Sequence, residues 1–269
     1  MVITAGIDIG STYSKVVILK DGAVMGHGVN PTGAFPDRSA MTGLEQALTQ
    51  AKIAKQDIQY SVSTGYGRRV ASFANENISE ISANARGSKH VGQALGIRTI
   101  IDIGGQDTKV ISLDQNCDIL NFAMNDKCAA GTGRFLEVLA KELGVELDQM
   151  GPISLEAKDP IEITTTCLVF ARSEISANIA QGMDKRDLIA GIHTAITRRL
   201  LTMAKKVGIK REVFFDGGPA KNIGIVRSFE KELGYKIIVP EIPQIVTATG
   251  AAVIAAEKLG WKPTGGIKK

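Results

Sequence analysis

The sequence Ile7-Asp8-Ile9-Gly10 returns as Ile101-Asp102-Ile103-Gly104 after a shift of 94 residues. With this shift, seven of the thirteen positions from 7 to 19 are identical in the two copies. In each copy an apolar run reaches the aspartate and a glycine turn, and a second apolar run and a polar turn follow. This pattern predicts antiparallel strands joined by tight turns. Because a whole supersecondary unit is repeated, we predict two related halves that each open with a strand meander.

Helical periodicity follows the meander in both halves. The apolar positions of these two stretches share the spacing of one helix face. They are Leu44, Ala47, Leu48 and Ala51 in the first half, and Phe135, Leu136, Leu139 and Leu143 in the second. We therefore predict an α/β fold of two duplicated domains with a cleft between them. The first domain covers residues 1–95 and the second 96–269, and a C-terminal helix at about 244–260 packs back on the first.

Charge and hydropathy exclude several classes of protein. The 269 residues carry 32 Lys and Arg against 28 Asp and Glu, and this small, dispersed excess argues against nucleic-acid binding. The longest charge-free apolar stretch, residues 245–256, is shorter than the roughly 18 residues that span a bilayer. The N-terminus has no basic leader or cleavable apolar region, and three cysteines do not make a disulfide framework. We expect a cytoplasmic protein with no membrane or nucleic-acid partner.

The two Asp-Ile-Gly turns are candidate phosphate sites. Their hydroxyls and backbone N–H groups suit phosphate oxygens, and the two aspartates, Asp8 and Asp102, suit Mg²⁺. The candidate contacts are Gly10, Ser11, Thr12, Tyr13, Ser14 and Lys15 in the first turn and Gly104, Gly105 and Gln106 in the second. The alternative is that Asp and Gly serve turn geometry alone. The sequence has neither a P-loop nor a G-x-G-x-x-G motif that opens a βαβ unit.

A third glycine turn follows the apolar run Val213–Phe215 and precedes a predicted helix. Its residues are Asp216, Gly217, Gly218, Pro219, Ala220 and Lys221. A turn without side chains at its tip can admit a flat nucleobase against the backbone. The other reading is an ordinary connection between a strand and a helix.

Two of the three cysteines are predicted to precede helices. Cys128 stands immediately before a predicted helix whose apolar face has Phe135, Leu136, Leu139 and Leu143. Cys167 stands immediately before another, with Leu168, Ala171, Ile175 and Ile179 on one face. A thiolate at a helix N-terminus is stabilised by the helix dipole and is a good iron ligand. Alternatively, both are small buried apolar residues. Since a [4Fe–4S] cluster needs four thiolates, a twofold dimer of this chain would supply them.

The three glycine turns, in this order, resemble the phosphate-1, phosphate-2 and adenosine motifs of the actin, Hsp70 and sugar-kinase superfamily. The resemblance covers nearly the whole chain. It implies two ribonuclease H-like domains, each with a five-stranded sheet, that close on Mg-ATP. It also implies nucleotide contacts at residues 11–15, 104–106 and 217–221, with Gln244 near the base. Asp8 and Asp102 would hold Mg²⁺, and either Gln106 or Asp107 would orient the attacking water.

The segments Lys127–Glu137 and Thr165–Glu174 resemble the activator ATPases of 2-hydroxyacyl-CoA dehydratases, in the family that includes the ATPase subunits of benzoyl-CoA reductase. The resemblance implies a homodimer with one [4Fe–4S] cluster held by Cys128 and Cys167 of both chains. It implies electron transfer from ferredoxin or flavodoxin, coupled to ATP hydrolysis, to a dehydratase that then forms a ketyl radical. Cys117 has no such setting.

Three rival functions remain at this point. A benzoyl-CoA reductase-type ATPase subunit shares the chemistry but needs different partners. A small-molecule kinase of the same superfamily has no use for cysteines at two helix starts. An ATP-dependent binding protein without catalysis predicts nucleotide binding without iron.

Overall fold

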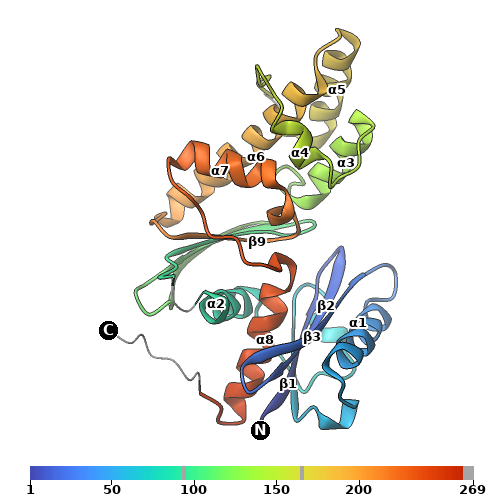
Figure 1. Cartoon of the computed structure of the whole chain (residues 1–269), viewed down its shortest axis with the longest axis vertical. Coiled ribbons are helices and arrows are strands. Elements are labelled where there is room, and N and C mark those ends of the chain that lie inside the picture. The colour runs from blue at the N-terminus through green and yellow to red at the C-terminus, as the bar shows by residue number, and fades with distance from the viewer. Residues whose placement is uncertain (93–94, 164–166, 263–269) are drawn as a thin grey trace. The chain divides into compact units, whose positions relative to one another are not determined.

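The structure is a computed structural model that describes residues 1–92, 95–163 and 167–262 (Figure 1). The chain folds into two units, each with its own sheet. Unit 1 comprises Met1–Ile97, Leu113–Ile119 and Pro240–Lys269, and unit 2 comprises Arg98–Ser112 and Leu120–Val239. The division of the chain at about residue 95 stays a prediction.

The sheet of unit 1 has the strand order β3-β2-β1-β4-β5. Its strands are β1 (Ile3–Ile9), β2 (Tyr13–Lys20), β3 (Ala23–Pro31), β4 (Tyr60–Thr64) and β5 (Glu76–Asn77). β1, β2 and β3 form the predicted antiparallel meander, and β4 joins β1 in parallel. The turn between β2 and β3 places Asp21 and Gly22 at positive φ, 49° and 86°, as a two-residue hairpin turn requires.

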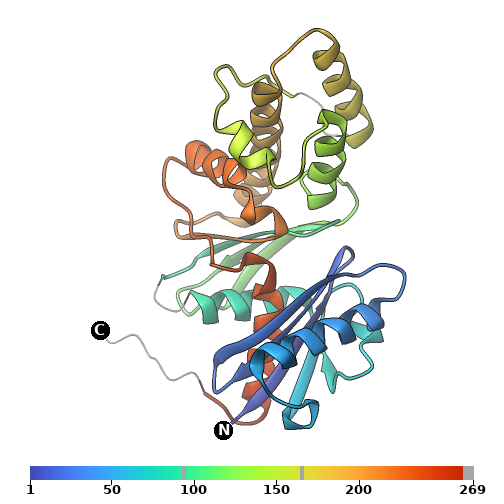
Figure 2. The ribbon, with the colours of Figure 1, turned by 45° about the vertical axis from the view of Figure 1, so that its right-hand side comes forward.

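Helices cover both faces of this sheet. They are α1 (Pro36–Ala51), α2 (Glu80–Val91) and α8 (Val246–Lys258), with the short 3-10 turns η1 (Lys55–Asp57), η2 (Arg68–Val70) and η4 (Pro243–Ile245). α1 buries its predicted apolar face against β2 and β3, which Figure 2 shows from the side of this helix. α8 packs on α2 and β1. This approach is close, since a Cβ at Gly6 would lie 1.9 Å from Ala248 O and one at Gly250 would lie 1.8 Å from Ala83 O.

Unit 2 repeats the meander with the strand order β8-β7-β6-β9. Its strands are β6 (Thr99–Ile103), β7 (Thr108–Leu113), β8 (Ile119–Asn125) and β9 (Val213–Gly217). The expected fifth strand is reduced to a single parallel bridge between Phe214 and Ile238. The helices are α3 (Gly133–Leu143), α4 (Met150–Ser154), α5 (Leu168–Ala180), α6 (Lys185–Val207), η3 (Gly218–Lys221) and α7 (Ile223–Leu233).

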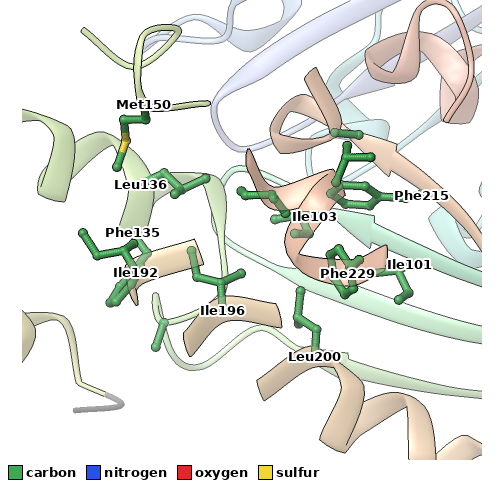
Figure 3. Packing of buried hydrophobic residues seen from close by; sticks show 14 of the residues in the cluster. Ile101, Ile103, Phe135, Leu136, Met150, Ile192, Ile196, Leu200, Phe215 and Phe229 are labelled. Carbon is green, nitrogen blue, oxygen red and sulfur yellow. The ribbon is translucent and has the colours of Figure 1, made fainter. Parts of the chain in front are cut away.

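The core of unit 2 joins its sheet to three helices. Figure 3 shows Ile101, Ile103 and Phe215 of the strands facing side chains of α3, α6 and α7. The rings of Phe215 and Phe229 lie 5.0 Å apart. The predicted apolar face of α3 is buried here, and burial of this kind contributes about 25 cal/mol per Å² of apolar surface. This packing holds the ends of β6 and β9 in place.

The fold is α/β with two units that each open with a strand meander, as predicted. In the described part of the chain, every helix is too short or too polar to cross a bilayer.

Candidate functional site

Each predicted phosphate turn begins with a cross-strand ion pair. Asp8 and Lys15 are register partners on β1 and β2, and Lys15 Nζ lies 2.9 Å from Asp8 Oδ2. Asp102 and Lys109 are register partners on β6 and β7, with 3.4 Å between Lys109 Nζ and Asp102 Oδ2. Both aspartates are buried, at 6% and 7% exposure. Each carboxylate therefore has a cation beside it, and the sequence repeat extends to the electrostatics of the two turns.

The turn of unit 1 is closed by its own backbone and by Thr32. Gly10 N donates to Tyr13 O at 3.0 Å, and Gly10 O accepts from Thr32 Oγ1 at 2.7 Å. Ser14 Oγ lies 3.1 Å from the same Thr32 hydroxyl. The predicted contacts Ser11 and Thr12 are half-buried at the tip of this turn. The turn thus presents backbone and hydroxyl groups next to the Asp8–Lys15 pair.

The turn of unit 2 has the same internal bond, from Gly104 N to Asp107 O at 3.0 Å. Asp107 Oδ1 also accepts from Lys109 Nζ at 2.8 Å, so this lysine serves two carboxylates. Gln106 is exposed at the tip, and Gly105 beside it is half-buried.

Three hydrogen bonds join this second turn to the segment after β8. Gly133 N donates to Gly104 O and Arg134 N to Gly105 O, both at 2.8 Å. Thr108 Oγ1 donates to Gly131 O at 2.7 Å. We call these three bonds the joint. No local sequence pattern predicts the joint, because its partners lie far apart in the chain.

One glycine in each unit stands against the aspartate. Gly65 has φ +85° and a Cβ there would lie 2.4 Å from Asp8 Oδ1. Gly217 has φ +86° and a Cβ there would lie 2.7 Å from Asp102 Oδ1. Only glycine tolerates both the backbone conformation and the contact. Gly65 was not among the predicted site residues, although it directly follows β4 and Gly217 is the last residue of β9.

The third turn lies beside the second on the sheet of unit 2. β6 and β9 are parallel, and Asp102 pairs in register with Asp216 and Ile103 with Gly217. Asp216 is 1% exposed, and Gly218 and Pro219 begin a 3-10 turn that ends at the exposed Lys221. The helix predicted after this turn is α7. Gln244 lies in η4 of unit 1, and its position near a base stays a prediction.

A buried imidazole supports this third turn. His193 Nε2 lies 3.1 Å from Asn222 Nδ2, and Asn222 Oδ1 caps α7 by accepting from Gly224 N at 2.9 Å. His193 Nδ1 lies 3.1 Å from Ser154 Oγ. Burial lowers the pKa of His193 to about 3. The ring is therefore neutral, and it receives the amide hydrogen of Asn222 while it donates to Ser154.

The two candidate iron ligands both lie in unit 2, but in different settings. Cys167 is the N-cap of α5 and is exposed, as predicted for a helix start. The prediction that Cys128 stands at a helix N-terminus is wrong, because α3 begins only at Gly133, and its role as an iron ligand stays a prediction. Gly131 adopts φ +87° and Thr132 is the N-cap, so the chain makes one further turn before the helix. The first two N–H groups of α3 are bonded within the joint and do not face a thiolate.

The described residues of one chain do not form a metal site by themselves. In the described residues no three His, Cys, Asp or Glu side chains come together as a metal site. Cys167 is exposed, whereas Cys128 is half-buried against the core of unit 2. Thr165 and Thr166 of the resembling segment lie outside the described residues.

Comparison with known proteins gives close relatives over the full length. The chain is 45% identical to a 2-hydroxyisocaproyl-CoA dehydratase activator of Clostridioides difficile, over 95% of each chain. It is 44% identical to an activator of lactoyl-CoA dehydratase of Anaerotignum propionicum, over 94% of this chain and 97% of the other. A solved structure of the Clostridium difficile activator with bound ADPNP superposes with a TM-score of 0.90 at 43% identity, covering 99% of this chain and 100% of that one. Residues 5–255 match the BadF/BadG/BcrA/BcrD ATPase family, and the chain is therefore an ATPase of that family.

Proposed function

We propose that this ATPase activates a 2-hydroxyacyl-CoA dehydratase by passing it one low-potential electron, in a step coupled to ATP hydrolysis. The observation that carries the proposal is that Cys128 and Cys167 lie in the same unit as the second phosphate turn, and that the joint ties the Cys128 segment to that turn. The activators named above support the choice of partner.

The nucleotide would be held by the glycine turns of both units. Residues 10–15 and 104–106 would contact phosphates through backbone N–H and hydroxyl groups, and residues 216–221 would take the adenosine, with Gln244 near the base. Asp8 and Asp102 would hold Mg²⁺ and its water ligands. Lys15 and Lys109 then have two roles, since each balances its aspartate now and lies within reach of added phosphate charge.

The attacking water would be oriented by Gln106. Its rival, Asp107, already accepts from Lys109, whereas Gln106 is exposed at the tip of the turn. An amide side chain can accept from and donate to a water without changing the charge beside the phosphate. The bond from Lys109 to Asp107 therefore favours Gln106 over Asp107 as the residue that would orient the water.

A homodimer would complete the metal site, with Cys128 and Cys167 of each chain as the four ligands of one [4Fe–4S] cluster. Such a cluster supplies one-electron transfer at low potential. The surface next to Cys167 supports a partner chain there, because Val169 and Phe170 are 68% and 65% exposed. Large apolar side chains in such a position are typical of a protein interface. The electron donor would be ferredoxin or flavodoxin, and the compartment the cytoplasm.

Anaerobic purification tests this proposal. We expect a brown protein with about two iron atoms per chain, and activation of a 2-hydroxyacyl-CoA dehydratase that requires both ATP and a reduced donor. A colourless protein that hydrolyses ATP and phosphorylates a small molecule would identify the kinase instead. Nucleotide binding with neither iron nor hydrolysis would also contradict the proposal.

A further inference from the structure

We propose that Thr108 is a positioning residue that couples nucleotide at the Gly104–Asp107 turn to the Cys128 segment. The proposal rests on the proposed function of that turn as a phosphate site. It differs from a movement of whole units, because every group involved belongs to unit 2.

The bond between Thr108 and Gly131 is the buried part of the joint. Thr108 is 0% exposed and follows the turn directly as the first residue of β7. Its hydroxyl donates to Gly131 O, while the carbonyls of Gly104 and Gly105 accept from the first two N–H groups of α3. Phosphate that orders the turn therefore fixes two of its carbonyls against α3. Leaving the buried carbonyl of Gly131 without its donor costs free energy, so residues 131–134 and the turn shift together.

The segment between Cys128 and the joint is braced internally. Asn125 Nδ2 donates to Cys128 O at 2.8 Å, and Thr132 Oγ1 donates to Ala129 O at 2.6 Å. Thr132 is 0% and Ala130 is 3% exposed, so the segment has a buried underside. Displacement at Gly131 is therefore transmitted to Cys128 by four residues that move as one body.

Hydrogen exchange of the full-length protein tests the coupling, with Mg-ADP as the probe and its binding measured separately by calorimetry. Saturating ADP should slow exchange of the amides of residues 128–136 about tenfold, within the range usual for coupled sites. In Thr108→Val, which keeps the shape but loses the donor, the slowing should fall below about twofold. Thr108→Ser restores the hydroxyl and should restore the effect.

Two further variants complete the design. Ser112→Ala removes another hydroxyl of β7, which donates to Gly208 O at 3.4 Å outside the nucleotide site, and should leave the exchange response of residues 128–136 intact at saturating ADP. If Thr108→Val does not fold, Gly133→Ala replaces it, since its methyl group would lie 3.1 Å from Gly104 O. This variant should weaken the response as Thr108→Val does.

Three outcomes would overturn the inference. One is ADP binding to the wild type without slower exchange in residues 128–136. Another is an unchanged response in Thr108→Val, and the third is an equal loss in Thr108→Val and Thr108→Ser. Failure of the wild type to bind ADP would overturn the proposed function as well, and calorimetry distinguishes that result from the others.

Discussion

The two phosphate turns share their geometry and differ in what closes them. In unit 1, Ser14 and the carbonyl of Gly10 both contact Thr32, the residue that follows β3. In unit 2, Thr108 stands at the position of Ser14, shifted by 94 residues, and bonds to Gly131 after β8. The hydroxyl at this position of the repeat thus contacts Thr32 in unit 1 and the Cys128 segment in unit 2.

The two copies of the repeat keep the same turn and differ in the segment that packs on it. The Asp–Lys pair and the left-handed glycine are present in both units. The segment after the third strand is free to differ, and in unit 2 it carries Cys128. Four sets of variants test two points. One is whether both units bind nucleotide through the same groups, and the other is whether only unit 2 couples that binding to the cysteines.

Loss of the cysteines has the largest expected effect. Cys128→Ala or Cys167→Ala removes two of four thiolates in a dimer, and iron content should fall by at least about 90%. Dimerisation should weaken as well. Cys117→Ala, in unit 1, is the matched control and should keep iron and colour. Iron assay and analytical ultracentrifugation measure both effects, and a tight dimer after chelation would show that the cluster contributes little to the interface.

Loss of the aspartate of either unit should stop ATP hydrolysis. Asp8→Asn and Asp102→Asn should each lower ATP turnover about 100-fold or more and leave iron in place. Their stability should differ. In the described residues, Lys15 forms an ion pair with Asp8 alone. Lys109 still has Asp107 when Asp102 is replaced. Urea denaturation should therefore show a loss about 1 kcal/mol larger for Asp8→Asn.

Unchanged turnover in both aspartate variants would contradict the metal role. Equal losses of stability would show instead that the second partner of Lys109 contributes nothing.

The sequence predicted the two meanders because strand alternation and glycine turns are local signals. It also predicted the apolar faces of α1, α3 and α5. It misplaced the start of α3, since only the left-handed conformation of Gly131 reveals the extra turn. The joint depends on contacts between residues more than twenty positions apart, and local patterns hold no information on them.

The role of His193 cannot be predicted from the sequence for a similar reason. This histidine has no partner at metal-ligand spacing, and its actual partners, Ser154 and Asn222, lie at distant positions in the chain. Its role is to support the third turn, which only the packing of α4, α6 and α7 reveals.

The free energy of unfolding in acid should show the contribution of the buried His193. The pKa of His193 is about 3 in the folded protein and 6.5 when unperturbed, so the unfolded chain binds the proton first as pH falls. The contribution is complete above about pH 6.5 and is lost toward pH 3, by up to about 1.4 kcal/mol per pH unit. His193→Gln should flatten this slope between pH 6 and 4 in urea denaturation. His90, whose pKa burial also lowers, is present in both proteins and cancels in the difference.

Identical slopes in wild type and His193→Gln would mean that the imidazole is not buried as a neutral group.

The two equivalent hydroxyls should give the smallest effects. Thr108→Val leaves Gly131 O without this donor and should cost about 1 to 2 kcal/mol of unfolding free energy. Ser14→Ala should cost about 1 kcal/mol or less, because Thr32 still donates to Gly10 O. Denaturation at a fixed protein concentration measures both, and a larger loss for Ser14→Ala would reverse the comparison.

A redox titration of the iron-containing dimer, with and without Mg-nucleotide, tests the central claim most directly. If the phosphate turn and the Cys128 segment are coupled, nucleotide must change the reduction potential, and reduction must change nucleotide affinity by the same free energy. A tenfold coupling corresponds to about 60 mV for one electron. We predict different midpoint potentials in the nucleotide-free, ADP and ATP states. Identical potentials in all three would contradict the claim, and the protein would be an ATPase whose hydrolysis does not act on electron transfer.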